Sequence, residues 1–227
     1  MATFILSVGG STIVPDGKVN VAFLKQLKTF ITRRAAKGDR FVIICGGGGT
    51  CRIYNEGLRR VIKPTKSELD WLGIYTTHLN AQFVRLVFGK LAHPTIVGDH
   101  AAFEVKRWKT SVVVGGGHKP GGSTDTNTIL FAKKLGAKDV VNISNVDFLY
   151  TKDPRKFKDA KKITHISWKE YRGMMGDTWT PGMHVPFDPV ASRLAQAAKM
   201  RVALLGSDVK NLSNFFAGKV YKGSMIE

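Results

Sequence analysis

The chain has 227 residues, of which 43% are hydrophobic and 23% are charged, and this balance excludes a disordered chain. Its formal net charge of +18 favours an anionic partner, although nucleotides, nucleic acids and acidic surfaces all meet that condition. The two cysteines, Cys45 and Cys51, have no second pair and no histidine cluster beside them, which excludes a disulfide scaffold and a cysteine-rich zinc site.

No apolar run approaches the roughly 18 residues that span a bilayer, and the first residues lack the basic flank of a signal peptide. We therefore expect a cytoplasmic protein without a membrane partner. Lysine and arginine are spread along the chain with no stacking motif and no concentrated basic stripe, so nucleic acid is not the expected partner.

Short runs of β-branched residues alternate with helical patterns along the chain. Leu24, Leu27 and Ile31 recur at helical spacing, and Asp188-Pro189 is a start signal for a later helix. The alternation predicts an α/β fold with a parallel sheet and helices on both faces, in a single domain over residues 1–227. The expected strands are Phe4–Val8, Phe41–Cys45, Thr95–Val97, Ser111–Val114, Val140–Ile143 and Val202–Leu205.

The segment from Leu69 to Leu86 predicts a helix with two partly apolar faces. Such a helix is either buried within the chain or shared between subunits, and both interpretations stand at this point. If the second face is exposed, we expect a two-fold subunit contact there, because large apolar side chains are costly to leave in water. One face holds Leu69, Leu72, Thr76, Leu79, Phe83 and Leu86, and the other holds Trp71, Tyr75 and His78.

The stretch from Gly173 to Pro189 is rich in Gly, Pro, Met and Trp and lacks periodicity, which predicts a loop that can act as a lid. His184 lies in this stretch and His118 lies earlier in the chain. Both are expected to be ordinary hydrogen-bonded loop residues.

Three glycine clusters follow predicted strands. In an open α/β sheet the loops that leave the carboxyl ends of strands form the ligand crevice, and glycine lets backbone N–H groups approach anionic oxygens. One cluster would be weak support, since tight turns need glycine in any case, but three at successive strand ends predict a site for several phosphates. Neither the Walker pattern nor the dinucleotide fingerprint is present. The clusters are Gly9-Gly10-Ser11, Gly46-Gly47-Gly48-Gly49, and Gly115-Gly116-Gly117 running into Pro120 to Asp125.

In their order and spacing these clusters, with the motifs around them, resemble the amino-acid kinase superfamily and, within it, the UMP kinases of the archaeal type. The resemblance runs nearly end to end, to Gly223–Ile226. The further motifs that carry it are Val14-Pro15, Arg52, Ser123-Thr124-Asp125, Asn145-Val146-Asp147 with Tyr150, Asp153-Pro154, and Asp188-Pro189-Val190-Ala191.

The resemblance implies a three-layer α/β/α sandwich around a mainly parallel sheet, with an acceptor-binding lobe over about 1–120 and an ATP-binding lobe over about 121–227. It implies transfer of the γ-phosphoryl group of ATP to UMP, which yields UDP, and a hexamer built from dimers.

Roles for single residues follow from the same resemblance. Gly46, Gly47 and Arg52 would hold the UMP phosphate, and Asp70 would bind the ribose hydroxyls. The residues implied to bind ATP are Gly9, Gly10, Ser11, Asn145, Asp147, Tyr150 and Asp153. Those implied to bind UMP are Gly46, Gly47, Gly48, Arg52, Asp70, Gly73, Ser123 and Thr124.

The implied reaction needs no general base, because the acceptor is a phosphate oxygen that is already ionised at neutral pH. The enzyme has to align two anions and neutralise charge with Mg²⁺ brought by ATP, with backbone donors and with cationic side chains. Asp125 is therefore interpreted as an organiser of cations, and no metal cluster built from protein side chains is expected. The catalytic candidates are Asp125, Arg52 and Lys119.

Two departures from the superfamily pattern concern lysines. The first strand reads Leu6-Ser7-Val8 where many superfamily kinases have a lysine, and archaeal-type UMP kinases also lack it. The lysine expected ahead of Asp188-Pro189 has no counterpart, and Lys119 is the candidate for the missing charge. Phe148 also stands where glycine is usual.

Other interpretations stay open. One is a kinase of another small phosphate acceptor such as isopentenyl phosphate, but relatives with that substrate carry a histidine in the second glycine loop and Gly46 to Thr50 has none. A second is a nucleotide-binding homologue that has lost catalysis along with its lysines. A third, suggested by charge alone, is a nucleic-acid-binding module. Arg52 can also be a solvated surface residue, and Asp125, Asp147 and Asp153 can serve helix ends and turns.

Overall fold

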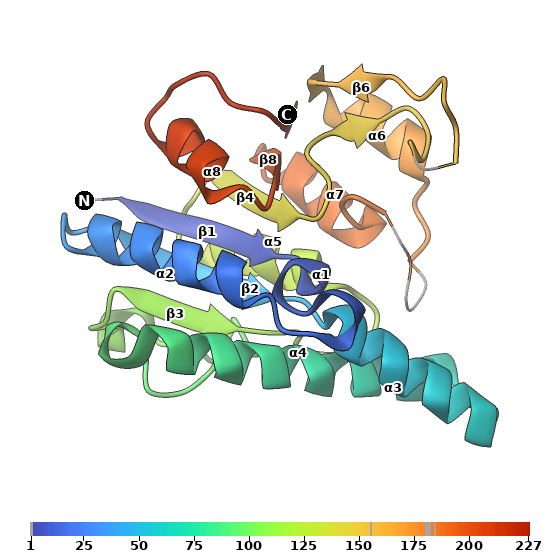
Figure 1. The fold of residues 1–227 in the computed structure, drawn as a ribbon, viewed down its shortest axis with the longest axis horizontal. Coiled ribbons are helices and arrows are strands. Elements are labelled where there is room, and N and C mark those ends of the chain that lie inside the picture. Colours follow the sequence, from blue (N-terminus) through green and yellow to red (C-terminus); the bar gives the residue numbers. More distant parts are fainter. Residues whose placement is uncertain (1, 155, 180–182, 184) are drawn as a thin grey trace.

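A seven-stranded sheet forms the centre of the computed structural model, which describes residues 2–154, 156–179, 183 and 185–227 (Figure 1). Its strand order is β3-β2-β1-β4-β8-β9-β7. The strands from β3 to β8 in this order run parallel, β9 is antiparallel to β8, and β7 is parallel to β9. The strands are β1 Thr3–Val8, β2 Arg40–Cys45, β3 Val112–Gly115, β4 Asp139–Ser144, β7 His165–Ile166, β8 Arg201–Gly206 and β9 Ser224–Ile226.

Alternate side chains of the parallel strands enter two separate cores, one on each face of the sheet. Leu6 and Ile43 pack with α2, α4 and α8, whereas Ile5 and Val42 pack with α5, α6 and α7. Burial of both faces explains why the strands read as nearly continuous apolar runs, and it confirms the predicted three-layer α/β/α architecture. The helices are α1 Gly10–Ile13, α2 Val21–Ala35, α3 Gly48–Val61, α4 Lys66–Phe88, α5 Thr124–Lys134, α6 Trp168–Met175, α7 Pro189–Ala197 and α8 Val209–Phe216.

Side chains at the helix ends explain where several helices begin. Thr65 caps α4, and its hydroxyl accepts from the Glu68 N–H while the Glu68 carboxylate accepts from the Thr65 N–H, as in a capping box. Asp188 caps α7 directly before Pro189, whose fixed φ suits the first helical position. No helix among the described residues is long and apolar enough to cross a membrane.

The expected strand at Thr95–Val97 is wrong. This segment bonds to β3 at isolated points, where the His93 and Val97 N–H groups donate to the carbonyls of Val112 and Val114. Thr95 is the residue whose N–H would pair with β3 between these points, but it faces the Nδ1 of His93 at 3.4 Å instead, so no continuous ladder forms.

The expected loop from Gly173 to Pro189 is also too long at its start. Residues 173–175 belong to α6, which begins at a capping box formed by Ser167 and Glu170 and ends at Gly176 with φ of 76°. His184 and residues 180–182 lie outside the described part of the chain. The sequence also did not predict the short strands β7 and β9, or the antiparallel pair β5 Leu149–Tyr150 and β6 Lys162–Ile163.

The first two glycine loops contact each other backbone to backbone. A Cβ added to Gly10 would lie 2.0 Å from the Gly48 nitrogen, and one added to Gly48 would lie 2.2 Å from the Gly10 carbonyl oxygen. Gly48 also has φ of 62°, a conformation that other residues adopt only with strain. These glycines are therefore required by the fold itself.

A pair of substitutions on α3 tests this contact. Gly48→Ala should lower the free energy of unfolding by about 2 kcal/mol or more, because neither backbone can move aside. Gly57→Ala lies on the same helix where an added Cβ meets nothing within 4 Å, so it should be neutral or stabilise by up to about 1 kcal/mol. Urea unfolding of both variants measures the difference, and equal effects would contradict the contact.

Candidate active site

The predicted phosphate-binding loops leave one edge of the sheet. β1 pairs with both β2 and β4, and Val8 stands opposite Cys45 at the ends of the first two strands. The Gly9 N–H donates to the Ile143 carbonyl and the Gly46 N–H donates to the Val8 carbonyl, both within 2.9 Å. These two N–H groups extend the sheet, so the donors for a ligand have to come from later positions in each loop.

Arg52 lies where the first and second loops meet. Its Nη1 donates to the Ser11 hydroxyl at 2.9 Å, and its Nη2 lies 4.0 Å from the exposed carboxylate of Asp16. Arg52 belongs to α3, whose N-cap residue Gly47 supplies no side-chain cap. The Gly49 N–H already donates to the Val14 carbonyl at 2.8 Å, so only part of the first turn of the helix is left for another acceptor. A guanidinium beside an uncapped helix N-terminus is suited to an anion such as a phosphate.

Asp125 lies behind these loops in the first turn of α5. Its Oδ1 accepts from the Ser7 hydroxyl at 2.8 Å and from the Asn142 amide at 3.0 Å. Removal of the carboxyl group from water, followed by the nearby charge of Asp188, raises the pKa of Asp125 to about 7, although the bond from Ser7 opposes the rise. Ser7 occupies the first-strand position where the resemblance places a lysine in other kinases.

Asp188 connects α5 with α7. Its Oδ2 accepts from the hydroxyls of Ser123 and Thr126, and its Oδ1 accepts from the N–H groups of Val190 and Ala191. In the part of the chain that the structure describes, neither Asp125 nor Asp188 forms an ion pair with lysine or arginine. The two carboxyl groups therefore form a region of unbalanced negative potential.

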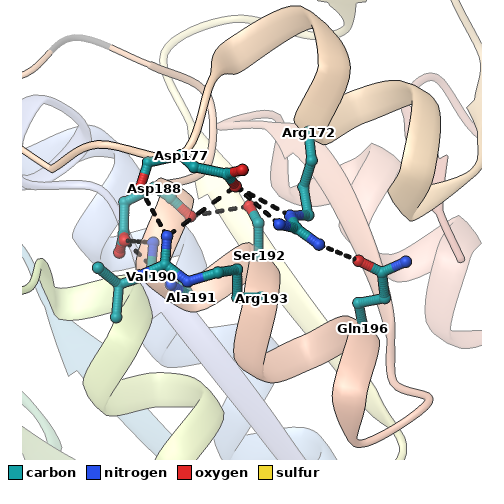
Figure 2. Close-up of polar contacts among 8 residues, drawn as sticks. All are labelled: Arg172, Asp177, Asp188, Val190, Ala191, Ser192, Arg193 and Gln196. Atoms are coloured by element: carbon teal, nitrogen blue, oxygen red, sulfur yellow. Dashed lines mark hydrogen bonds and ion pairs between the residues drawn. The ribbon is translucent and has the colours of Figure 1, made fainter.

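The start of the expected lid is tied to the helices around it. Figure 2 shows Asp177 between Arg172 of α6 and Arg193 of α7. Arg172 donates to the Asp177 carboxylate at 2.8 and 3.1 Å and to Gln196 at 2.7 Å, and Arg193 donates to the Asp177 carbonyl at 2.6 Å. The residues before 180 are thus held near the cap of α7, and a lid movement in the rest of the stretch stays a prediction.

Helix α4 supplies several polar side chains to the glycine loops. Asp70 accepts from the Gly121 N–H at 3.0 Å, so the residue expected to bind ribose lies against the third loop. Asn80 donates to the carbonyls of Gly46 and Gly47 at 2.7 and 3.1 Å. At Gly73 an added Cβ would meet the Cys51 sulfur at 3.4 Å, so α4 and α3 pack closely here, and its expected contact with UMP stays a prediction.

The other expected residues are placed as follows. Asn145 and Asp147 are exposed beyond β4, and the Asp147 carboxylate occupies the space that a Cβ on Gly206 would fill. Tyr150 is half-buried in β5, and Asp153 follows it in a turn where the N–H groups of Lys156 and Phe157 donate to its carbonyl. Thr124 is the first residue of α5, directly after the cap Ser123.

Lys119 is exposed in the third loop and has no hydrogen bond or ion pair within the described ranges of the chain. The structure therefore does not bring it against Asp125.

Sequence reasoning missed Thr77, His78 and Asn80 as supports of the loops. A run of polar residues at buried positions of an otherwise apolar helix was the available signal.

The chain belongs to the amino acid kinase family, whose model matches residues 2–206. Among curated proteins it is 33% identical over 226 residues to the uridylate kinase of Pyrococcus abyssi, with 98% of both chains covered. It is also 33% identical over 228 residues to that of Methanospirillum hungatei, with 100% of this chain and 95% of the relative covered.

Solved structures show the same fold. The uridylate kinase of Archaeoglobus fulgidus superposes with a TM-score of 0.79 at 23% identity, covering 99% of this chain and 100% of that chain. The UMP kinase of Bacillus anthracis superposes with a TM-score of 0.77 at 17% identity, covering 100% and 95%.

The raised pKa of Asp125 predicts a pH dependence of stability. The folded protein keeps this proton up to about pH 7, whereas the unfolded chain releases it near the ordinary value of 3.8, so ionisation costs stability between these values. The contribution of Asp125 to stability should be full below about pH 4, fall as the pH rises to about 7 and stay low above that. Asp125→Asn keeps the acceptor for Ser7 and Asn142, and should stabilise the protein at pH 8 by on the order of 2 kcal/mol.

Thermal unfolding at pH 5 and pH 8 measures this effect. Asp16→Asn is the control, because the Asp16 side chain is 98% exposed and lies in no hydrogen-bonded pair. A gain for Asp125→Asn that is equal at the two pH values would show that the folded protein ionises Asp125 as readily as the unfolded chain.

Proposed function

We propose that the chain is a UMP kinase, which transfers the γ-phosphoryl group of ATP to UMP and releases UDP and ADP. The observation that carries the proposal is the meeting of Arg52 and Ser11 beside the uncapped start of α3. This arrangement offers a cation, a hydroxyl and backbone N–H groups to the two phosphates that react. The names of the most similar curated relatives, uridylate kinases over nearly the whole chain, support the choice of acceptor.

In the proposed reaction the acceptor is a phosphate oxygen of UMP, which attacks the γ-phosphorus while the bond to the bridging oxygen of ADP breaks. Arg52 turns from Ser11 toward the UMP phosphate, which its side chain can do because it is 43% exposed. The loop of Gly9, Gly10 and Ser11 lies between the two substrates and orients the transferred group. Catalysis then rests on alignment and charge neutralisation, with no base required.

The residues present fit a divalent cation brought by ATP. Mg²⁺ usually takes one or two carboxylates together with substrate phosphates, so the proposed ion needs no group of three metal-binding side chains. Asp125, with a pKa near 7 and no cationic partner among the described residues, is the carboxylate that would hold Mg²⁺. The bound ion would neutralise charge on the phosphates, and Lys119 stays the candidate for a second cation.

We assign UMP to the lobe of residues 1–120 and ATP to the lobe of residues 121–227, with the segment from Asn145 to Asp153 around the nucleotide. Support comes from the position of this segment at the carboxyl end of β4, next to β1 and its glycine loop. The cytoplasmic location expected from the sequence stays a prediction.

Arg52 is the most informative probe of the reaction. Arg52→Ala should lower kcat/KM for UMP by about 10²–10³, on the scale of one lost charge-stabilising donor, with little change in the melting temperature. Arg60→Ala is the matched control on the same helix, since Arg60 pairs only with the exposed Glu56. Asp125→Asn should instead lower kcat with a modest effect on KM, because no contact to UMP is removed.

A coupled assay for ADP, with and without each acceptor, makes this test. Turnover with isopentenyl phosphate in place of UMP would reassign the acceptor. ATP binding without formation of UDP would identify a homologue that has lost catalysis.

Helix α4 also carries an exposed apolar stripe, made of Trp71, Tyr75, Leu79, Phe83 and Leu86. These side chains are between 39% and 64% exposed, and they follow one another along one side of the helix. We propose that a second copy of the chain covers this stripe through a two-fold contact, as in a dimer that builds the expected hexamer. An apolar side facing water along a helix of this length is costly for a free monomer.

A charge placed in the stripe tests this contact. Leu79→Asp should shift the protein toward monomers, because the contact would bury an unpaired carboxylate. Val220→Asp is the control, as Val220 is 94% exposed and lies outside the stripe. Light scattering at micromolar concentration reads the mass, and a monomeric wild-type protein would refute the proposed contact.

A further inference from the structure

Helix α4 bonds to both backbone polar groups of Gly117 in the third glycine loop. The Thr77 hydroxyl accepts from the Gly117 N–H at 2.8 Å, and the His78 Nε2 lies 2.7 Å from the Gly117 carbonyl oxygen. Because a carbonyl oxygen only accepts, His78 must carry its proton on Nε2 and donate it. Both polar atoms of Gly117 are therefore fixed by adjacent residues of one helix.

His78 is half-buried and does not belong to the exposed stripe, although the sequence pattern placed it on one face with Trp71 and Tyr75. That grouping was wrong, because Leu79, Phe83 and Leu86 share the exposed side with those two residues.

The His78 ring occupies a narrow slot in the protein. A Cβ added to Gly98 would lie 3.1 Å from the His78 Nε2, and one added to Gly116 would lie 2.8 Å from the ring carbon Cδ2. Gly98 and Gly116, both distant from His78 in sequence, thus leave the space for its ring. The shape of this space fixes the direction in which Nε2 donates.

Gly117 begins the segment that carries the expected acceptor contacts. Further along this segment the Gly121 N–H donates to Asp70, and Ser123 caps α5, whose first turn contains Asp125. A rotation of the Gly117 peptide would displace all of these groups together. Loops of this kind keep one arrangement only where both backbone polar atoms have partners.

We propose that His78 is a positioning residue for the acceptor site, which acts through Gly117 and does not touch the substrate. It keeps the third glycine loop in the register that holds Gly121 against Asp70 and presents the start of α5 to UMP. The proposal rests on the proposed UMP kinase function. It adds a residue that is expected to act on the acceptor, because His78 bonds to the third glycine loop, which lies against Asp70 and leads to Ser123.

Two substitutions of His78 separate the hydrogen bond from the bulk of the ring. His78→Leu fills the slot but leaves the Gly117 carbonyl without a donor, and it should raise the KM for UMP about tenfold, with the KM for ATP unchanged. His78→Gln offers an N–H donor at a similar distance along its side chain and should restore the wild-type KM. His165→Ala is the control, because His165 lies on β7 at the opposite edge of the sheet from β3.

A second readout needs no substrate. Amide hydrogen exchange at Gly117 to Gly122 should be about tenfold faster in His78→Leu, and His78→Gln should again resemble the wild type. Thr77→Val, which keeps the shape of the side chain and removes the acceptor of the Gly117 N–H, should speed exchange in the same segment.

These readouts separate the two proposals. If the wild-type protein forms no UDP while His78→Leu speeds exchange and His78→Gln restores it, the kinase function fails and the loop-positioning role stands. The positioning role is overturned if His78→Leu leaves both the KM for UMP and the exchange unchanged. It is also overturned if His78→Gln is as impaired as His78→Leu, because the bulk of the ring would then be what matters.

Discussion

The approach of two backbones, at Gly10 and Gly48, is the constraint on which the rest of the site depends. Strands β1 and β2 deliver their loops to the same edge of the sheet, and only residues without a Cβ allow the loops to touch there. The contact brings Ser11 of one loop within reach of Arg52 of the next. It also places the start of α3 beside both, so that the charge, the hydroxyl and the N-terminus of the helix meet at one place.

Behind this contact the electrostatic balance is unusual for a site that handles anions. Asp125 and Asp188 lie close together, and hydroxyl and amide donors rather than lysines face them in the described residues. Ser7 supports Asp125 where other kinases of the family are expected to have a cation. A buried carboxyl group that ionises costs stability at neutral pH, and in the proposed reaction the same group would hold a cation.

The sequence predicted the parts of the fold that depend on local pattern. The runs Phe4–Val8 and Phe41–Cys45 became β1 and β2 with nearly the same bounds, because buried parallel strands require continuous apolar residues. The strand expected at Thr95–Val97 failed because the Thr95 N–H bonds to His93 rather than to β3. Strand β9 could not be foreseen because three residues carry too little pattern.

The same limit applies to the site, where the sequence predicts what a local segment shows and misses contacts between distant segments. Glycine clusters and the Arg52 position can be read from one segment at a time, and the structure places Arg52 against Ser11 as a shared site requires. The inward turn of His78 depends on space left by Gly98 and Gly116, which lie far from it in sequence. The bonds of Asp188 to Ser123 and Thr126 likewise join residues more than sixty positions apart, and no local pattern reports such pairs.

The glycines of the three loops differ in how much evolutionary change they permit. At Gly10, Gly46 and Gly48 any added side-chain atom would meet backbone, so these positions cannot hold a larger residue unless the backbone shifts. At Gly121 in the third loop an added Cβ meets nothing within 4 Å, and only its φ of 97° restricts the choice of residue. The third loop therefore has room for substitution at Gly121, whereas at its start a Cβ on Gly115 would lie 2.1 Å from the Val97 carbonyl oxygen, as restricted as in the first two loops.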